Sequence, residues 1–296
     1  MANWYFRRIL TTSERRGQFN QKTWKIISIK IKHIFSRFIH HRKKEEEVSY
    51  SGSFTTWAEA ESQSEGYDQK NIFQKNLSAL EQIMVGNKKC EKDTILYDDY
   101  QYSLPTILGI NFAANQDNKP IYVLDYGGGF ASSYFRNFGI LKKFNLNWTV
   151  VEQDHIVEIG NQKFKGVDQI SFLTRSLLQE RYDDFSFHLV LLGSSIQFFA
   201  NPSKILGSFS SQSLKSIVVE QTPFVENGSS KITIQNVREP VYEASYPVWH
   251  FNEVEFRSWI DPLFETEYRM VNPHVCNSCT GFTSHLIDFV FVNKSS

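Results

Sequence analysis

A glycine-rich turn directly after an apolar run is the sequence feature that most constrains how this chain can fold. In VLDYGGGFASSYF, the run 121–126 leads into Gly127, Gly128 and Gly129, and a helical pattern begins at Ser132. Strand, glycine turn and helix in this order are typical of a nucleotide-binding half-sheet, because glycine lets the backbone approach a ligand closely. The alternative is that the glycines only form a tight turn.

Beyond residue 119, short β-branched runs alternate with helical stretches, which predicts a parallel sheet with crossover helices. We expect five parallel strands, at 121–126, 148–153, 170–173, 187–193 and 216–221. Two later candidates, around 267–271 and 285–292, are too close together for a crossover helix and should pair antiparallel. The predicted fold class is therefore α/β, with a mostly parallel sheet and an antiparallel last strand.

Three segments divide the chain in this prediction: a basic amphipathic helical arm (1–48), an N-terminal helical cap (49–115) and the α/β domain (116–296). The acidic and serine-rich stretch 45–53 marks the first boundary, because it can neither continue an apolar stripe nor bury surface. In the cap, Thr55 or Thr56 can start a short helix, and Asp68 can start a longer one that runs toward Gly86.

The formal net charge of zero hides a division between a basic arm and an acidic body. The chain has 32 Lys and Arg against 32 Asp and Glu, but residues 1–44 hold many of the bases and, among acids, only Glu14. The stretch 19–44 places one apolar face opposite lysines and an arginine, which suits the surface of an anionic membrane. Docking on a partner and packing against its own protein are the alternatives. The acidic body and the absence of a recognised motif argue against nucleic acid.

Three cysteines are too few for a disulfide framework, and this favours a reducing compartment. The chain has no apolar run of the roughly 18 residues that would span a bilayer, and no signal-peptide core at its start. We therefore expect a cytoplasmic protein, with the arm allowing a position at the inner face of the membrane.

Glu152 follows Asp125 by 27 positions, at the end of the second predicted strand. An acidic residue near this spacing accepts hydrogen bonds from a ribose diol, and ligands of open sheets bind beyond the carboxyl ends of the strands. A carboxylate beside the glycine turn would repel a pyrophosphate, whereas S-adenosylmethionine has no phosphate and offers an amino-acid group. This favours S-adenosylmethionine, with NAD as the second choice of cofactor.

Several motifs together resemble the class I methyltransferase fold. They are VLDYGGGFASSYFRN, WTVVEQDHIVEIG, VLLGSSIQFFANPSKIL and VEQTPF, with supporting segments YSGSFTTWAEAESQSEGYD, ILYDDYQYSLP and YEASYPVWHFNEVEF. More narrowly, the segment 50–292 resembles bacterial methyltransferases associated with O-antigen and surface-polysaccharide gene clusters. The family tends to have an arginine where this chain has Gln221.

This resemblance implies a Rossmann-like class I methyltransferase sheet that binds S-adenosylmethionine. Asp125 and the glycine turn would hold the amino-acid end of the cofactor, Glu152 its ribose, and the loop after the fourth strand would lie near the transferred methyl group. The full set of expected cofactor residues is Asp125, Gly127, Gly128, Gly129, Glu152, Gln153, Gly193, Ser194, Ser195 and Gln197.

Transfer to a hydroxyl acceptor needs alignment of the two reactants and removal of a proton, so a base is desirable. We expect the catalytic candidates to be His155, His250 and Glu220, since each is predicted near the carboxyl edge of the sheet. A structural or surface role is the alternative for both histidines. An ordered loop could form the wall of the acceptor site, where the rings of Tyr242, Tyr246 and Trp249 would stack on a sugar. Simple core packing is the equal alternative for these three residues.

A zinc site is a weaker hypothesis, carried by His274, Cys276, Cys279 and His285. No second CxxC exists, so two reduced loop cysteines are the favoured interpretation and we expect no metal. The preferred function is O-methylation of a sugar in a surface-polysaccharide intermediate. The alternatives are a catalytically silent docking protein of a polysaccharide assembly complex and an NAD-linked oxidoreductase. The oligomeric state is open.

Overall fold

The computed structural model describes residues 48–67, 69–114, 119–181, 186–209, 213–260, 262–277 and 281–294. The basic stretch 19–44 lies outside them. No helix in these ranges is long and apolar enough to cross a membrane.

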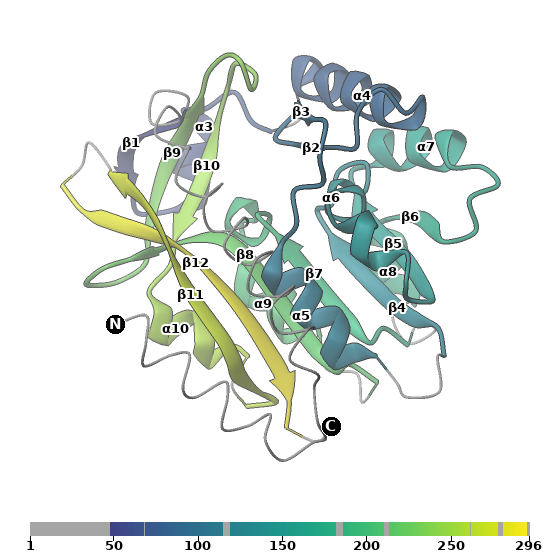
Figure 1. Ribbon diagram of the computed structural model, residues 1–296. Coiled ribbons are helices and arrows are strands. Elements are labelled where there is room, and N and C mark those ends of the chain that lie inside the picture. Colours follow the sequence, from purple (N-terminus) through teal and green to yellow (C-terminus); the bar gives the residue numbers. More distant parts are fainter. Residues whose placement is uncertain are drawn as a thin grey trace. The chain divides into compact units, whose positions relative to one another are not determined.

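A seven-stranded sheet forms the centre of the described region (Figure 1). The strands from β6 to β8 are parallel, whereas β12 runs antiparallel to β8 and β11 antiparallel to β12. Both expectations are confirmed, the five parallel strands and the antiparallel final pair, and with them the Rossmann-like, mostly parallel α/β sheet. The order across the sheet is β6 (Ile170–Thr174), β5 (Leu146–Glu152), β4 (Ile121–Tyr126), β7 (Leu189–Gly193), β8 (Ser216–Val225), β12 (Thr283–Asn293) and β11 (Phe264–Asn277).

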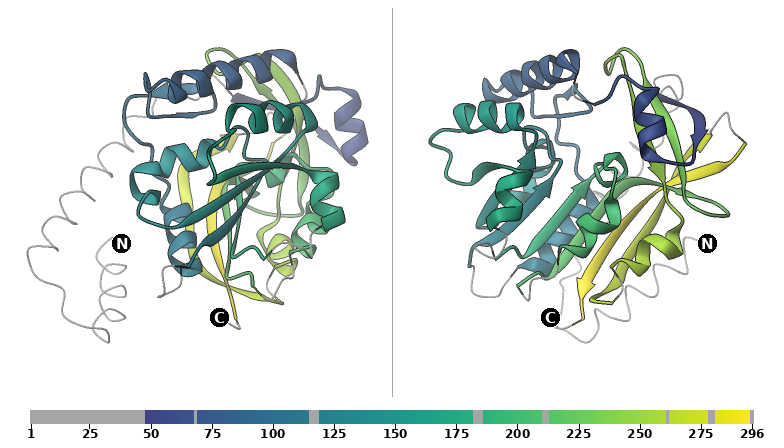
Figure 2. Two further views of the ribbon diagram at one scale, coloured as in Figure 1. Left: turned by 90° about the vertical axis from the view of Figure 1, so that its right-hand side faces the viewer. Right: turned by 180° about the vertical axis from the view of Figure 1, so that it is seen from behind.

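The central strands β4, β7 and β8 are largely buried on both faces, which explains why they read as continuous apolar runs. On β4, Val123 packs into one core cluster and Leu124 into the other, because successive side chains of a strand point to opposite faces. Figure 2 shows the resulting layers from two further sides. The first cluster includes side chains of α5 (Leu104–Ala113), α6 (Ser132–Leu141) and α7 (Asp154–Lys163), and the second those of α8 (Arg175–Arg181), α9 (Pro202–Gly207) and α10 (Glu253–Ser258).

A smaller antiparallel sheet has the order β1 (Val48–Phe54), β9 (Lys231–Val237) and β10 (Ala244–His250). The segment YEASYPVWHF, expected as a loop, therefore lies mainly in β10. Pro247 fits there because β10 is an edge strand, where a residue without an N–H leaves no neighbouring strand unpaired.

The expected cap contributes strands as well as helices. Its β1 pairs with β9, and its α5 packs so closely on the main sheet that a Cβ on Gly109 would lie 2.3 Å from Val218. Thr56 caps α3 (Trp57–Ser62) through a capping box with Glu59, as the sequence allowed. The longer helix, α4 (Lys70–Met84), has Gln69 as its N-cap, and the predicted cap Asp68 lies outside the described residues.

Candidate functional site

The glycine turn lies at the carboxyl end of β4, and its backbone conformation requires glycine. Gly127 has φ 76° and Gly129 has φ 58°, a region that side chains with a Cβ rarely adopt. A Cβ on Gly127 would also lie 2.8 Å from the Cβ of Ser195, in the loop after β7. The turn thus leaves bare backbone beside a neighbouring loop, and its three glycines line a cavity at this edge of the sheet.

Asp125 lies beneath the turn rather than in the cavity. Its side chain is fully buried, and its Oδ2 accepts a hydrogen bond of 2.9 Å from Trp148 Nε1. A Cβ on Gly128 would lie 2.4 Å from the Asp125 carboxyl carbon, so the glycine makes room for this acid. Burial raises the pKa of Asp125 to about 7. The residue is therefore placed to support the turn from below.

Glu152 lines the cavity at the end of β5, as its position in the sequence predicted. Its Oε1 accepts from the backbone N–H of Gly129 and its Oε2 from that of Gln153, each at 3.0 Å. Burial raises the pKa of this carboxyl, and the two N–H donors act in the opposite direction. The carboxylate is thus held in one orientation by the glycine turn itself, and Gln153 lines the cavity beside it.

The loop after β7 contributes to the cavity only in part. Gly193 and Ser194 line it, whereas Ser195 and Gln197 lie behind it. Ser195 Oγ donates to the Tyr126 carbonyl at 2.6 Å and thereby ties this loop to the glycine turn. Gln197 lies in η2 (Ile196–Phe198), and its Oε1 accepts a hydrogen bond of 3.3 Å from Thr222 Oγ1 on β8. These two side chains are positioned to hold the loop rather than to contact a ligand.

Two of the three expected bases line the cavity. Glu220, buried on β8, accepts hydrogen bonds from the hydroxyls of Ser103 and Thr106, both through Oε1. Its Oε2 accepts no hydrogen bond among the described residues. His155, on α7, lines the cavity with its ring 5.1 Å from that of Phe73.

The structure places His250 away from the cavity. It is fully buried on β10, with Nε2 3.0 Å from Thr233 Oγ1 and Nδ1 2.7 Å from Ser284 Oγ. Burial lowers its pKa to about 4, so the ring is neutral near physiological pH. Because both ring nitrogens have hydroxyl partners, His250 fits the structural alternative raised for it.

The roof of the cavity was not predicted from the sequence. It comes from α4, the strand β2 (Cys90–Lys92) and the turn that joins β2 to β3 (Ile95–Tyr97), none of which carries a recognisable binding pattern. Four charged residues that line this cavity were not predicted from the sequence: Glu91, Lys92, Asp93 and Arg136.

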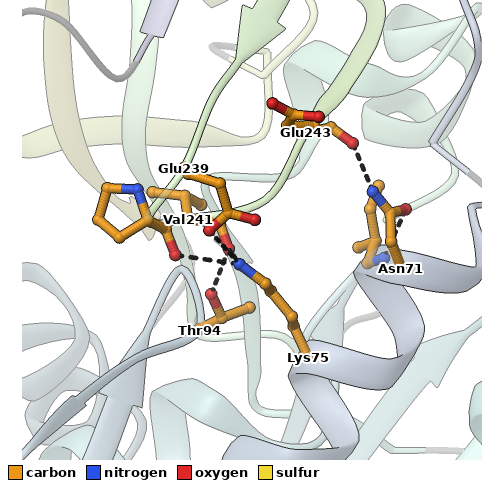
Figure 3. Close-up of polar contacts among 8 residues, drawn as sticks. Asn71, Lys75, Thr94, Glu239, Val241 and Glu243 are labelled. Atoms are coloured by element: carbon orange, nitrogen blue, oxygen red, sulfur yellow. Dashed lines mark hydrogen bonds and ion pairs between the residues drawn. The ribbon is translucent and has the colours of Figure 1, made fainter.

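Hydrogen bonds tie this roof to the connection between β9 and β10 (Figure 3). Lys75 Nζ forms an ion pair with Glu239 at 2.6 Å and donates to the carbonyls of Pro240 and Val241. Thr94 Oγ1 donates to the same Val241 carbonyl at 2.9 Å. The contacts bring together segments more than 140 residues apart in the sequence, and they hold Tyr242 against the cavity.

The three aromatic residues expected in an acceptor wall occupy different places. Tyr242 lines the cavity together with Tyr67, and its hydroxyl lies 3.2 Å from that of Tyr246. Trp249 points elsewhere: its Nε1 donates to the Phe199 carbonyl at 3.1 Å.

Of the residues weighed for zinc, Cys276 is buried, and Tyr50 donates a hydrogen bond to its Sγ at 3.6 Å. Cys279 and the side chain of His274 lie outside the described part of the chain. In the described ranges, no group of three His, Cys, Asp or Glu is arranged to hold a metal ion.

No family model and no curated protein matches this chain. Three solved structures illustrate its likeness to known folds. The N-terminal domain of EvdMO1 with SAH bound is 11% identical, with a TM-score of 0.45 over 77% of this chain and 100% of that one. The MccD protein is 9% identical, with a TM-score of 0.43 over 64% and 96%. TrmK of M. capricolum, in complex with S-adenosyl-homocysteine, is 11% identical, with a TM-score of 0.36 over 66% and 70%.

Proposed function

We propose that this chain is an S-adenosylmethionine-dependent methyltransferase. One observation carries the proposal: the glycine turn, the fixed carboxylate of Glu152 and the loop after β7 line one cavity at the carboxyl ends of the parallel strands. Open α/β sheets bind their ligands at this edge, where the strand order reverses. Here the order reverses between β4 and β7, which are neighbours in the sheet.

The residues present fit this cofactor. Gly127, Gly128 and Gly129 line the cavity without side chains, so the cofactor's amino-acid end can approach the backbone. Glu152 keeps lone pairs free on both oxygens after accepting its two backbone hydrogen bonds, and a ribose diol can donate to them. A pyrophosphate fits less well, because Asp93, Glu152 and Glu220 all line the cavity.

When bound, S-adenosylmethionine supplies a methyl group on a sulfonium, which an acceptor displaces in line. The chain's contribution is to align the acceptor and to take its proton. Glu220 suits the second task, since the hydroxyls of Ser103 and Thr106 fix one of its oxygens and leave the other without a described partner. His155, which lines the same cavity, is the second candidate.

For the acceptor we propose a hydroxyl of a sugar in a surface-polysaccharide intermediate. The support is the ring of Tyr242 beside that of Tyr67, since aromatic faces stack on the apolar faces of sugars. The acidic lining also suits a neutral polyol better than an anionic group. The association with polysaccharide assembly comes from the sequence resemblance alone.

Isothermal titration calorimetry tests the cofactor. We expect S-adenosylmethionine and S-adenosylhomocysteine to bind, and NAD not to bind. Glu152→Gln should weaken both by about 10-fold to 100-fold, the usual effect of losing hydrogen bonds to a charged group. Glu158→Gln, an exposed residue of α7, is the matched control and should change neither affinity. A folded wild-type protein that binds neither sulfur ligand would contradict the proposal and favour the docking-protein hypothesis.

A further inference from the structure

Arg136 lies at the wall of the cavity and has no partner among the residues that the structure describes. It lies in α6, one turn beyond the helix start at Ser132, and it lines the cavity. Its Nε is buried without a hydrogen-bond partner, and its guanidinium forms no ion pair with any described residue. A buried charged group normally has a partner, because removing it from water is costly otherwise.

A neighbouring acid, Glu91, does not fill this role. Glu91, on β2, is buried and accepts from Ser132 Oγ through Oε1 and from the Thr94 backbone N–H, at 2.8 Å, through Oε2. Both of its oxygens are thus engaged with groups other than Arg136. Burial also raises the pKa of Glu91, which favours its neutral form and weakens its compensation of a neighbouring cation.

The surroundings of Arg136 decide which kind of anion fits. A guanidinium presents a planar fork of N–H donors that matches a carboxylate in two parallel hydrogen bonds. A phosphate would meet repulsion, because Asp93, Glu152 and Glu220 line the same cavity. An amino-acid group matches both the positive and the negative charges of the lining, since its carboxylate can pair with Arg136 while its ammonium faces a glutamate.

We propose that Arg136 forms a carboxylate-binding subsite of this cavity, and that a ligand carboxylate pairs with it where no described residue does. The ligand group we assign to it is the α-carboxylate of the cofactor, and this assignment rests on the proposed function. A carboxylate carried by the acceptor is the other source, and the experiment separates the two.

Calorimetry with three ligands tests the assignment. The ligands are S-adenosylhomocysteine, its analogue without the α-carboxylate, and methylthioadenosine, which lacks the whole amino-acid part. The wild type should bind the first ligand about 10-fold to 100-fold more tightly than the second. In Arg136→Gln this ratio should fall to nearly 1, with methylthioadenosine affinity unchanged. Arg136→Lys keeps the charge but not the fork, and should give an intermediate ratio.

Arg257→Gln is the matched control, because it makes the same change at an arginine of α10 that does not line the cavity. It should keep the wild-type ratio. A wild-type ratio in Arg136→Gln would overturn the assignment to the cofactor.

A second measurement tests the subsite without the cofactor. Titration with sodium formate should shift the Nε–H resonance of Arg136, identified as the arginine signal that Arg136→Lys lacks. A shift with an unchanged ligand ratio would support the subsite and place its carboxylate on the acceptor. An unmoved resonance would overturn the subsite. Failure of all adenosyl ligands would refute the proposed function alone, since the formate result still decides on Arg136.

Discussion

Trp148 Nε1 donates a 2.9 Å hydrogen bond to Asp125 Oδ2, from one parallel strand to the next and directly below the glycine turn. The other oxygen of Asp125 has no partner among the described residues. The most conspicuous acid of the glycine motif is therefore a support of the backbone, and Glu152 is the acid that reaches the cavity.

Asp125 should make the protein less stable as the pH rises. Its folded-state pKa is raised to about 7 from 3.8, so between these values the folded state binds more protons than the unfolded state. Stability should then fall from about pH 4 to pH 7, by at most about 1.4 kcal/mol per pH unit from this group.

Asp125→Asn, which resembles the neutral acid, should remove this part of the pH dependence. Urea unfolding of both proteins at pH 5, 6, 7 and 8 measures it. Asp288 titrates with a pKa near 6, also raised by burial, and should leave a residual slope in the variant. Equal slopes in the two proteins would contradict the role of Asp125.

His250 should act in the opposite direction. Its folded-state pKa of about 4 lies below the ordinary value of 6.5, so the unfolded state binds more protons between these values. Its contribution to stability is present above pH 6.5 and lost as the pH falls toward 4. His250→Gln should therefore lose less stability than the wild type on acidification from pH 7 to pH 5, measured by urea unfolding. A steeper loss in the variant would refute this.

Gly127→Ala should weaken cofactor binding as well as folding. The φ of 76° costs about 1–2 kcal/mol for a residue with a Cβ, and the new methyl group would lie 2.8 Å from Ser195 Cβ. Gly228→Ala is a matched control, because Gly228 has φ 87° but no atom within 4 Å of its Cβ position. Both variants should lose about 1 kcal/mol or more of stability, and only Gly127→Ala should lose S-adenosylhomocysteine affinity in calorimetry.

Glu220→Gln should slow methyl transfer without abolishing cofactor binding. A general base contributes about 10²-fold to 10⁴-fold to the rate, so kcat should fall by about 10²-fold or more. Transfer of labelled methyl from S-adenosylmethionine to sugar acceptors is the assay. His155→Gln is measured alongside, and His250→Gln should stay within about twofold of the wild type. A larger loss in His155→Gln than in Glu220→Gln would reassign the base.

The basic arm should bind anionic membranes. We expect the full chain to sediment with phosphatidylglycerol vesicles and not with phosphatidylcholine vesicles, and added salt should weaken the binding. Reversing two lysines of the apolar–basic stretch, Lys25→Glu with Lys32→Glu, should lower the affinity roughly 10-fold or more. The control is Lys142→Glu with Lys204→Glu, which makes the same change of net charge at two exposed lysines outside the arm. Equal binding to both vesicle types would refute a membrane role.

The main sheet and one side of the cavity could be predicted from local sequence patterns. The apolar runs of β4, β5, β7 and β8 could be recognised in the sequence, because a strand that is buried on both faces consists mainly of consecutive apolar residues. Gly127, Gly129 and Glu152 were readable for a related reason: each follows a strand directly, and the carboxyl ends of parallel strands meet at one edge.

The other side of the cavity, formed by α4, β2 and the connection between β9 and β10, depends on contacts between segments that are distant in the sequence. Tyr50 pairs with Gln235 and Lys75 reaches Glu239, and pairings over such separations leave no periodicity in either segment. Tertiary packing also determines which of the predicted site residues line the cavity. Local pattern gave Asp125 and His250 the same standing as Glu152, whereas packing buried the first two against Trp148 and Ser284. In the sequence, Arg136 resembles an ordinary charged residue on a helix surface. Its Nε is buried in the structure, where α6 contacts β2, a segment from a different part of the chain.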